Sequence, residues 1–317
     1  MRSPFKNQFH LQRGLTLVEL LIALGLSALI TLAGIASLTV ARQGFSSADA
    51  SSGIENDARF ATSVIRRLIV QAGYLEEKYA MDFGSEFKNQ GTVEIEPNIK
   101  GFNNADYKEN LVTGISTSVS GTSLNKSDML VLRYQAGRAI NGSDTPDETM
   151  INCSGGTAKV TAATSSVDRM TSVFHIQKSK EEPTLMCTWQ NDAGIWKTEP
   201  LVQGVETMQI LYGFDGAPAS PDSVPETYLR ADQLTGSSNA ETLRNWRRVR
   251  SIRIGLVMRG PSGSAPERNV PAQYPLGAPG TMDSTGDPGS IFPAQTDGRL
   301  RQTVTFTVHL RNPQDNV

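Results

Sequence analysis

The sequence has few of the residues from which catalytic and metal sites are usually built. Its only histidines are His10, His175 and His309, and its only cysteines are Cys153 and Cys187. Two cysteines cannot supply the four ligands of a structural zinc site, and the histidines lie far apart in the chain. The sequence also lacks a Walker-type phosphate loop, a His-Glu-x-x-His motif, an EF-hand loop and a complete Gly-x-Ser-x-Gly motif. We therefore predict a protein that is not an enzyme and has no cofactor or metal site.

A large excess of charge of either sign is also absent. The formal net charge is -2, which excludes a general attraction to nucleic acid or to acidic membrane surfaces. One segment is locally rich in arginine. Because it passes into an alternating strand pattern, we interpret it as a solvated edge or a subunit contact. Nucleic acid is not an expected partner. The residues of this basic run are Arg244, Arg247, Arg248, Arg250 and Arg253. The acidic stretch 143–148 is interpreted as a turn, because a calcium site needs several converging oxygens.

The two cysteines allow two interpretations, and the location of the protein decides between them. If the body lies outside the cytoplasm, Cys153 and Cys187 are expected to form a disulfide. Such a bond would contribute about 3–4 kcal/mol to stability by restricting the unfolded chain. Two buried, reduced thiols are the alternative.

The first forty residues contain a basic segment followed by a long apolar one. Residues 1–14 include three positive charges and no negative one, and residues 15–40 are mostly apolar with a single charge, at Glu19. Twenty-six helical residues span roughly 39 Å, which is more than the hydrocarbon core of about 30 Å. The basic segment predicts a cytoplasmic N-terminus, so the rest of the chain would be exported.

Three interpretations of this segment differ in how they explain Glu19. A secretory signal peptide could be cut near residues 34–36, but the apolar run is too long and begins with a carboxylate. In a simple membrane anchor, Glu19 would be an unexplained cost. If the chain is instead cut between Gly14 and Leu15, the new ammonium of Leu15 and the Glu19 carboxylate stand four residues apart. Each could pair with its opposite on a neighbouring subunit, and the need to pair a buried charge would set the register of assembly.

At these positions the sequence resembles a known signal. Residues 13–20, Arg-Gly-Leu-Thr-Leu-Val-Glu-Leu, resemble the type III signal sequence of type IV prepilins. The resemblance implies that a prepilin peptidase cuts after Gly14 and N-methylates Leu15, and that Glu19 is the assembly carboxylate. Leu15 stands where the family usually has phenylalanine, which leaves the amine chemistry unchanged. The apolar segment also lacks the proline of many major pilins, so its helix is expected to be less kinked.

The helical pattern continues beyond the apolar segment. Residues 41–72 contain no proline, and apolar residues from Ile54 to Ala72 recur at spacings of three and four. Gly44 and residues 51–53 favour a bend or a break, and Gly73 predicts the end of the helix. A continuous helix from Leu15 to Ala72 would be about 85 Å long.

From residue 73 onward the sequence predicts a β-rich body. Alternating patterns predict strands that we expect to be antiparallel, because no comparable helix recurs between them. They cover residues 129–134, 171–176, 185–189, 207–212, 251–259 and 303–310. Residues 73–127 give no clear pattern, and residues 260–298 are predicted to be a long surface loop. The expected fold class is α+β and type IV pilin-like, divided into a leader (1–14), a transmembrane helix (15–40), an amphipathic helix (41–72) and a globular domain (73–317).

Several segments of the body carry a second resemblance. Residues 127–134, 201–213, 249–254 and 306–312, with Trp246 and the two cysteines, are similar in order to those of PilW-type minor pilins. This resemblance implies a subunit of the inner membrane, with a periplasmic body, that later joins the pilus. Its partners would be other minor pilins and the major pilin through the N-terminal helix, the prepilin peptidase, and a large tip adhesin. The alternatives are a J-type pseudopilin of type II secretion and, in another class, a periplasmic binding or enzymatic domain on a simple anchor.

Overall fold

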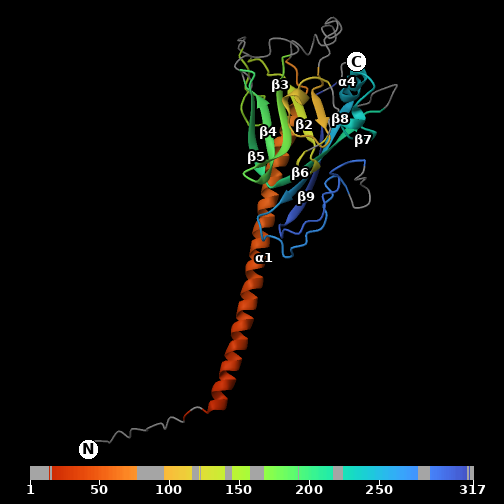
Figure 1. The fold of residues 1–317 in the computed structure, drawn as a ribbon. Helices are drawn as coiled ribbons and strands as arrows, with labels where there is room; N and C mark the ends of the chain where they lie inside the picture. Colours follow the sequence, from red (N-terminus) through yellow and green to blue (C-terminus); the bar gives the residue numbers. More distant parts are fainter. Residues whose placement is uncertain are drawn as a thin grey trace, which may run out of the picture.

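A single long helix passes up one side of a body made of two antiparallel sheets (Figure 1). This arrangement, seen in a computed structural model, is an α+β fold in which one long N-terminal helix packs on antiparallel sheets, as the sequence predicted. The structure describes residues 14, 16–76, 96–115, 121, 123–139, 145–157, 168–191, 193–216, 224–277, 286–312 and 314.

Helix α1 (Leu17–Gln71) is continuous for 55 residues, or roughly 82 Å. It runs through Gly44 and Gly53, where the sequence favoured a bend or a break. A glycine in a helix costs about 1 kcal/mol relative to alanine. Ala50, Ile54 and Ala58 are buried against the body around Gly53, and Gln43 and Ser47 bond to the body on either side of Gly44. These contacts outweigh the local preference.

The end of α1 is held by residues far away in the sequence. The side-chain amide of Asn312 donates to the carbonyls of Val70, Gln71 and Ala72 at 3.3, 3.4 and 3.1 Å. These carbonyls have no partner inside the helix, so the C-terminal segment of the chain supplies one. Gly73 follows with a φ of +76°, a conformation that glycine adopts without strain. The predicted helix end at Gly73 is therefore confirmed.

The body contains a five-stranded and a four-stranded sheet, and every pairing within them is antiparallel. The first has the order β1 (Ile99–Phe102), β2 (Met129–Tyr134), β3 (Met170–Ser179), β4 (Glu182–Gln190), β5 (Trp196–Gln203). The second has the order β7 (Thr227–Leu229), β6 (Val205–Phe214), β8 (Val249–Arg259), β9 (Arg301–His309). Short helical elements connect them: α3 (Glu109–Val112), η1 (Leu124–Lys126), η2 (Asp232–Leu234) and α4 (Asn239–Arg247).

The six predicted strands are confirmed as β2, β3, β4, β6, β8 and β9, several of them longer than expected. Three strands were missed. β1 contains Lys100 and Gly101, β5 is an edge strand with four exposed residues in succession, and β7 has only three residues. None of the three shows apolar alternation, which is the signal on which strand prediction depends.

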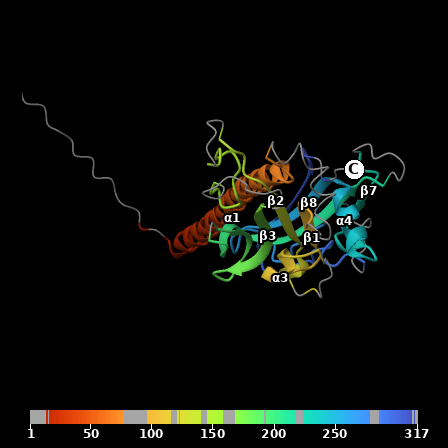
Figure 2. The same cartoon turned by 90° about the horizontal axis from the view of Figure 1, so that it is seen from above.

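The buried face of α1 packs against both sheets and forms the main core. Ile65, Leu68 and Ile69 are fully buried there with residues of β2, β3, β6 and β8. Successive residues of a strand point to opposite faces, so Met129 and Val131 of β2 belong to a second, smaller cluster under α3. Figure 2 shows α1 and α3 on opposite sides of β2 and β3.

Lys100 is an unusual member of this second layer because it is fully buried. Its ammonium donates to the carbonyls of Leu111 and Gly114 at 3.1 and 2.8 Å and lies 4.7 Å from the centre of the Phe102 ring. Burial, reinforced by the nearby Arg133 guanidinium, lowers the pKa of Lys100 to about 7. A buried lysine within a strand is exactly what apolar patterning cannot anticipate, since its partners are backbone carbonyls.

The description of residues 260–298 as a surface loop was wrong for the part that the structure describes. Val270 and Phe292 are buried, and the Thr305 hydroxyl donates to the Pro275 carbonyl at 2.6 Å. The segment also reaches α1, where Ser47 donates to the Ser264 carbonyl at 2.7 Å. It is irregular in backbone but covers β9 and ties it to the helix, as Figure 1 shows. Its many Gly, Pro and Ser residues predicted the irregularity and not the packing.

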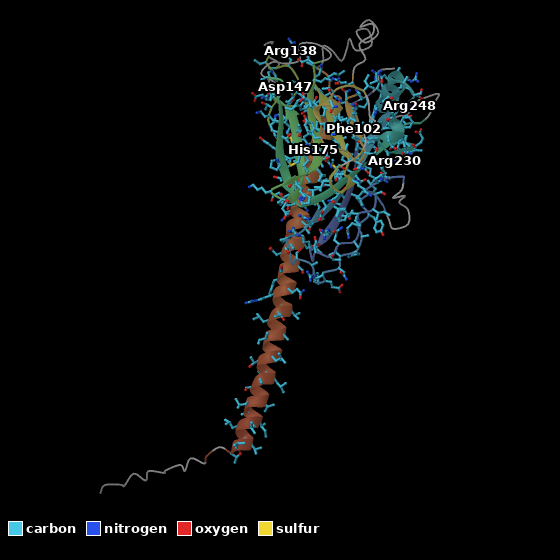
Figure 3. The ribbon with its side chains drawn as sticks, viewed as in Figure 1. Phe102, Arg138, Asp147, His175, Arg230 and Arg248 are labelled. Carbon is cyan, nitrogen blue, oxygen red and sulfur yellow. A yellow bond between two sulfur atoms is a disulfide. The ribbon has the colours of Figure 1, made fainter. Side chains whose placement is uncertain are left out.

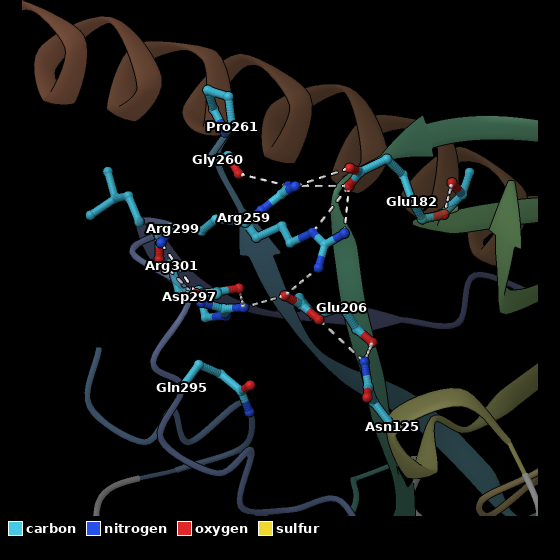
Figure 4. Close-up of polar contacts among 12 residues, drawn as sticks. Asn125, Glu182, Glu206, Arg259, Gly260, Pro261, Gln295, Asp297, Arg299 and Arg301 are labelled. Carbon is cyan, nitrogen blue, oxygen red and sulfur yellow. Dashed lines mark hydrogen bonds and ion pairs between the residues drawn. The ribbon is translucent and has the colours of Figure 1, made fainter. Parts of the chain in front are cut away.

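Two glutamates join the sheets through arginines (Figure 4). Glu206 of β6 pairs with Arg259 of β8 at 3.3 Å and with Arg301 of β9 at 2.7 Å. Arg259 also pairs with Glu182 of β4, which accepts a second ion pair from Arg299 at 3.3 Å. The side chains of Glu206 and Arg301 are only 5% and 2% exposed. Removing one partner of such a buried pair costs about 3–5 kcal/mol, because the other charge stays buried.

The close approach of the two sheets predicts opposite effects for two glycine substitutions. A Cβ at Gly101 would overlap the Tyr212 hydroxyl, whereas a Cβ at Gly53 meets open space. Gly101→Ala should lower the free energy of unfolding by about 1–3 kcal/mol, and Gly53→Ala should raise it by about 0.5–1 kcal/mol. Chemical denaturation of the detergent-solubilised chain measures both, and equal effects of the two variants would contradict this packing.

Buried His175 predicts a loss of stability in mild acid. Its Nε2 lies 2.8 Å from the Thr188 hydroxyl, its ring stacks on Tyr107, and burial lowers its pKa to about 4. The unfolded chain would bind this proton near pH 6.5. The contribution of the neutral His175 ring to the free energy of unfolding is therefore complete above pH 6.5. This contribution is lost as the pH falls toward 4.

The effect of His175 is isolated by comparison with His175→Gln, which cannot be protonated. Between pH 7 and pH 4.5 the wild type should lose roughly 2–3 kcal/mol more unfolding free energy than the variant. Because buried Asp128, whose pKa is raised by burial, is present in both chains, its own pH dependence cancels. A difference that does not change with pH would show that His175 titrates normally.

Candidate assembly interface

The N-terminal half of α1 is apolar on all sides and uncovered by the body. Every leucine, isoleucine and valine from Leu17 to Val40 is at least half exposed. Among the described residues, α1 is the one helix long and apolar enough to cross a membrane. An apolar surface of this extent needs lipid or other apolar helices around it. Figure 1 shows this half extending away from the body.

Three hydroxyl side chains of this segment are bonded inside the helix. The hydroxyls of Ser27, Thr31 and Thr39 donate to the carbonyls of Leu24, Ser27 and Ala36 at 2.8–2.9 Å. Hydroxyls bonded in this way need no water, which suits a segment surrounded by lipid or by other helices.

The helix begins with a capping box formed by Thr16 and Glu19. The Glu19 carboxylate accepts bonds from the Thr16 backbone N–H and hydroxyl, both at 2.9 Å, and the Glu19 N–H donates to the Thr16 hydroxyl at 3.3 Å. Thr16 was not among the residues predicted to matter, although Thr-x-x-Glu before an apolar run is the known sequence signal of a capping box. The pair holds an exposed carboxylate at the start of the apolar helix, where it also complements the helix dipole.

The predicted processing site lies at the edge of the described residues. Gly14 is exposed, whereas Leu15 and residues 1–13 lie outside the part of the chain that the structure describes. Cleavage after Gly14 and N-methylation of Leu15 therefore remain predictions.

The two cysteines are joined in a disulfide with a Cα–Cα distance of 5.7 Å. The bond attaches the segment around Cys153 to β4. Next to it, the Gln71 side chain at the end of α1 donates to the Ile151 carbonyl. The cross-link thus stiffens the part of the body that receives the end of the helix.

The other residues considered for chemistry or binding have structural roles. His309 is exposed on β9, and His175 is buried. Asp147 accepts bonds from the backbone N–H and hydroxyl of Thr149, as in a turn. Within the described ranges, no group of three His, Cys, Asp or Glu side chains could hold a metal ion.

The basic run begins in a helix and passes into a strand, and several of its guanidiniums are paired within the body. Arg244 and Arg247 belong to α4, while Arg250 and Arg253 belong to β8. Arg248 and Arg250 pair with buried Asp215 at 3.7 and 3.2 Å, and the Arg253 guanidinium lies 4.2 Å from the centre of the Tyr228 ring. Figure 3 shows Arg248 on the α4 side of the body, far from the exposed half of α1.

Comparison with known proteins agrees with this geometry at both ends of the chain. Residues 10–35 match the prokaryotic N-terminal methylation motif, and residues 173–312 match the model of Type IV Pilus-assembly protein W. The two matches together support a type IV pilus-assembly protein that is similar to the PilW family and carries an N-terminal methylation motif. This family consists of pilin-like structural proteins of the type IV pilus, so the resemblance found in the sequence is confirmed.

The two matches cover complementary parts of the chain. The first includes the capping box and most of the exposed apolar helix, and the second runs from β3 through β9. Solved structures that match include a type IV-like pilin from Thermus thermophilus, with 13% sequence identity and a TM-score of 0.39, over 82% of this chain and 98% of that one. No curated protein matches the sequence.

Proposed function

We propose that this chain is a minor pilin that primes the assembly of a type IV pilus and sits at or near its tip. The observation that carries the proposal is the N-terminal half of α1, which is apolar on every side, uncovered by its own body, and preceded by Thr16 and Glu19. Such a helix fits a bundle of like helices, with the β-rich body outside. Similarity to the PilW family favours a pilus over a secretion pseudopilus.

The first step is maturation in the inner membrane. The apolar half of α1 crosses the bilayer once, the basic leader stays in the cytoplasm, and the body lies in the periplasm. The prepilin peptidase cuts after Gly14 and N-methylates Leu15. Removal of three positive charges and no negative one changes the formal net charge from -2 to -5.

The second step is lateral packing of helices. Glu19 and the new ammonium of Leu15 become surrounded by apolar side chains when the helices of neighbouring subunits pack together. An unpaired carboxylate in such surroundings is strongly unfavourable. The stable arrangement places each Glu19 against an ammonium of a neighbour, which sets the axial register. Until then, the bonds from Thr16 satisfy the carboxylate within its own chain.

The third step is nucleation. A few subunits of different kinds, joined through their N-terminal helices, form the first layer onto which the major pilin is added. A subunit that enters this first layer stays at the end of the growing fibre. A large tip adhesin would then bind to the bodies of this layer.

Processing is tested by the mass of the N-terminal fragment. In membranes that contain prepilin peptidase, the chain should start at N-methylated Leu15, having lost residues 1–14. Without the peptidase, or with Gly14→Val, it should keep its leader. A chain that keeps Met1 in both membranes would indicate a simple anchor, and one that begins after Ala36 would indicate a secreted domain.

Assembly is tested by two substitutions at the start of α1. Glu19→Ala should still be cut and stay in the membrane, but the chain should be lost from sheared pili and fibre yield should fall, because register is no longer set. Thr16→Ala weakens the helix cap by about 1 kcal/mol and keeps the carboxylate, so it should leave incorporation nearly unchanged.

Immunoblots of sheared fibres and membranes measure both outcomes, and antibodies against the body should label fibre ends. Normal incorporation of Glu19→Ala would remove the ion-pair mechanism. Label spread evenly along the fibres would remove the tip position.

A further inference from the structure

A groove lies where the upper half of α1 meets the body. It has a volume of about 460 Å³, and its walls include Phe60 and Val64 of α1, Ile151 and Cys153 beside the disulfide, and Leu201 of β5. The walls are held in place by the disulfide and by the bond from Gln71 to the Ile151 carbonyl. The groove is therefore formed in the single chain.

Phe60 is a large apolar side chain in the body-bound half of α1, and 51% of its surface is exposed. Phe60, Val64 and Arg67 follow one another at spacings of four and three residues, so they share one side of the helix. Ile65 and Ile69 of the core stripe lie about 140° and 180° from Phe60 around the helix axis, and Val64 borders the core. Phe45, 76% exposed and about four turns closer to the membrane, lies within about 60° of Phe60 around the helix axis. The groove thus continues the exposed apolar side of the helix upward from the membrane segment.

The charge in the groove indicates what an occupant must carry. The Arg67 guanidinium is exposed at the groove, and no carboxylate in the described part of the chain forms an ion pair with it. Arg59, by contrast, is paired with Glu55 on the same helix. No acidic residue is among the described residues that line the groove. An apolar side chain next to a carboxylate would complement both features.

We propose that this groove receives an apolar side chain and an adjacent carboxylate from the body of a neighbouring pilin of a different kind. The inference rests on the proposed function, because lateral packing of the N-terminal helices brings the body of the next subunit beside this side of α1. The chain is a minor component, so its neighbours in the fibre are mostly other pilins. The groove continues the apolar side of α1, and the charge of Arg67 is unpaired. We infer that these two features favour such a neighbour over a second copy of this chain.

The test uses a photo-cross-linking amino acid in place of Phe60, in the full chain, in cells that make pili. Illumination should give an adduct that mass spectrometry identifies as another mature pilin. The same amino acid at Ile195, which is 54% exposed and does not line the groove, should not give that adduct. Arg67→Glu should lower the adduct yield about fivefold or more. Arg66→Glu, a neighbouring exposed arginine outside the groove, should leave the yield unchanged.

Three outcomes would overturn the inference: an adduct with a second copy of this chain, an adduct with a protein that is not a pilin, and no adduct although the chain is present in sheared pili. These results differ from failure of the proposed function. If Glu19→Ala is incorporated normally while the Phe60 adduct with a pilin still depends on Arg67, the groove is retained and the register mechanism is lost.

Discussion

The contact between the buried stripe of α1 and the two sheets is the interaction on which the rest of the structure depends. Ile54, Ile65, Leu68 and Ile69 are almost completely buried there, and each contributes about 1.5–3 kcal/mol. The same helix is uncovered from Leu17 to Val40. One element therefore forms the core of the body at one end and presents an exposed apolar surface at the other, so the packing of the body also fixes where that surface begins.

The body is also connected to the helix in ways that limit how the two parts can move. Asn312 holds the carbonyls at the end of α1, and Ser47 binds the segment that covers β9. The disulfide fixes the wall next to Gln71, while Glu182 and Glu206 join the two sheets. Because these contacts are distributed along the upper half of α1, the body has one orientation on the helix. If Glu19 sets the axial register of the helix in a fibre, it also sets the position of the body. A contact through the Phe60 groove requires the body to have such a fixed position.

Sequence prediction succeeded where one physical requirement decides the residue pattern. A membrane segment must be apolar along its length, an amphipathic helix must repeat its apolar residues every three or four positions, and a half-buried strand must alternate. These rules located α1, its end at Gly73 and six strands. They missed β1, where buried Lys100 is bonded to carbonyls of the α3 region, and β5, which lies exposed at the edge of its sheet. They also misjudged the residues around Val270 and Phe292, whose irregular backbone hides a packed interior.

What the sequence by itself determined is the residue pattern of the N-terminus, from which its processing is predicted, and the class of the protein. Arg13, Gly14 and Glu19 stand before and within a continuous apolar run, and this information is local, so it can be read without the fold. The tertiary structure alone decided that α1 stays unbroken through Gly44 and Gly53, that Arg248 and Arg250 are bound to Asp215, and that Phe60, Leu201 and Ile151 form one groove. Each of these depends on residues far apart in the chain, because free energy from packing and from buried charge pairs exceeds local preferences by several kcal/mol.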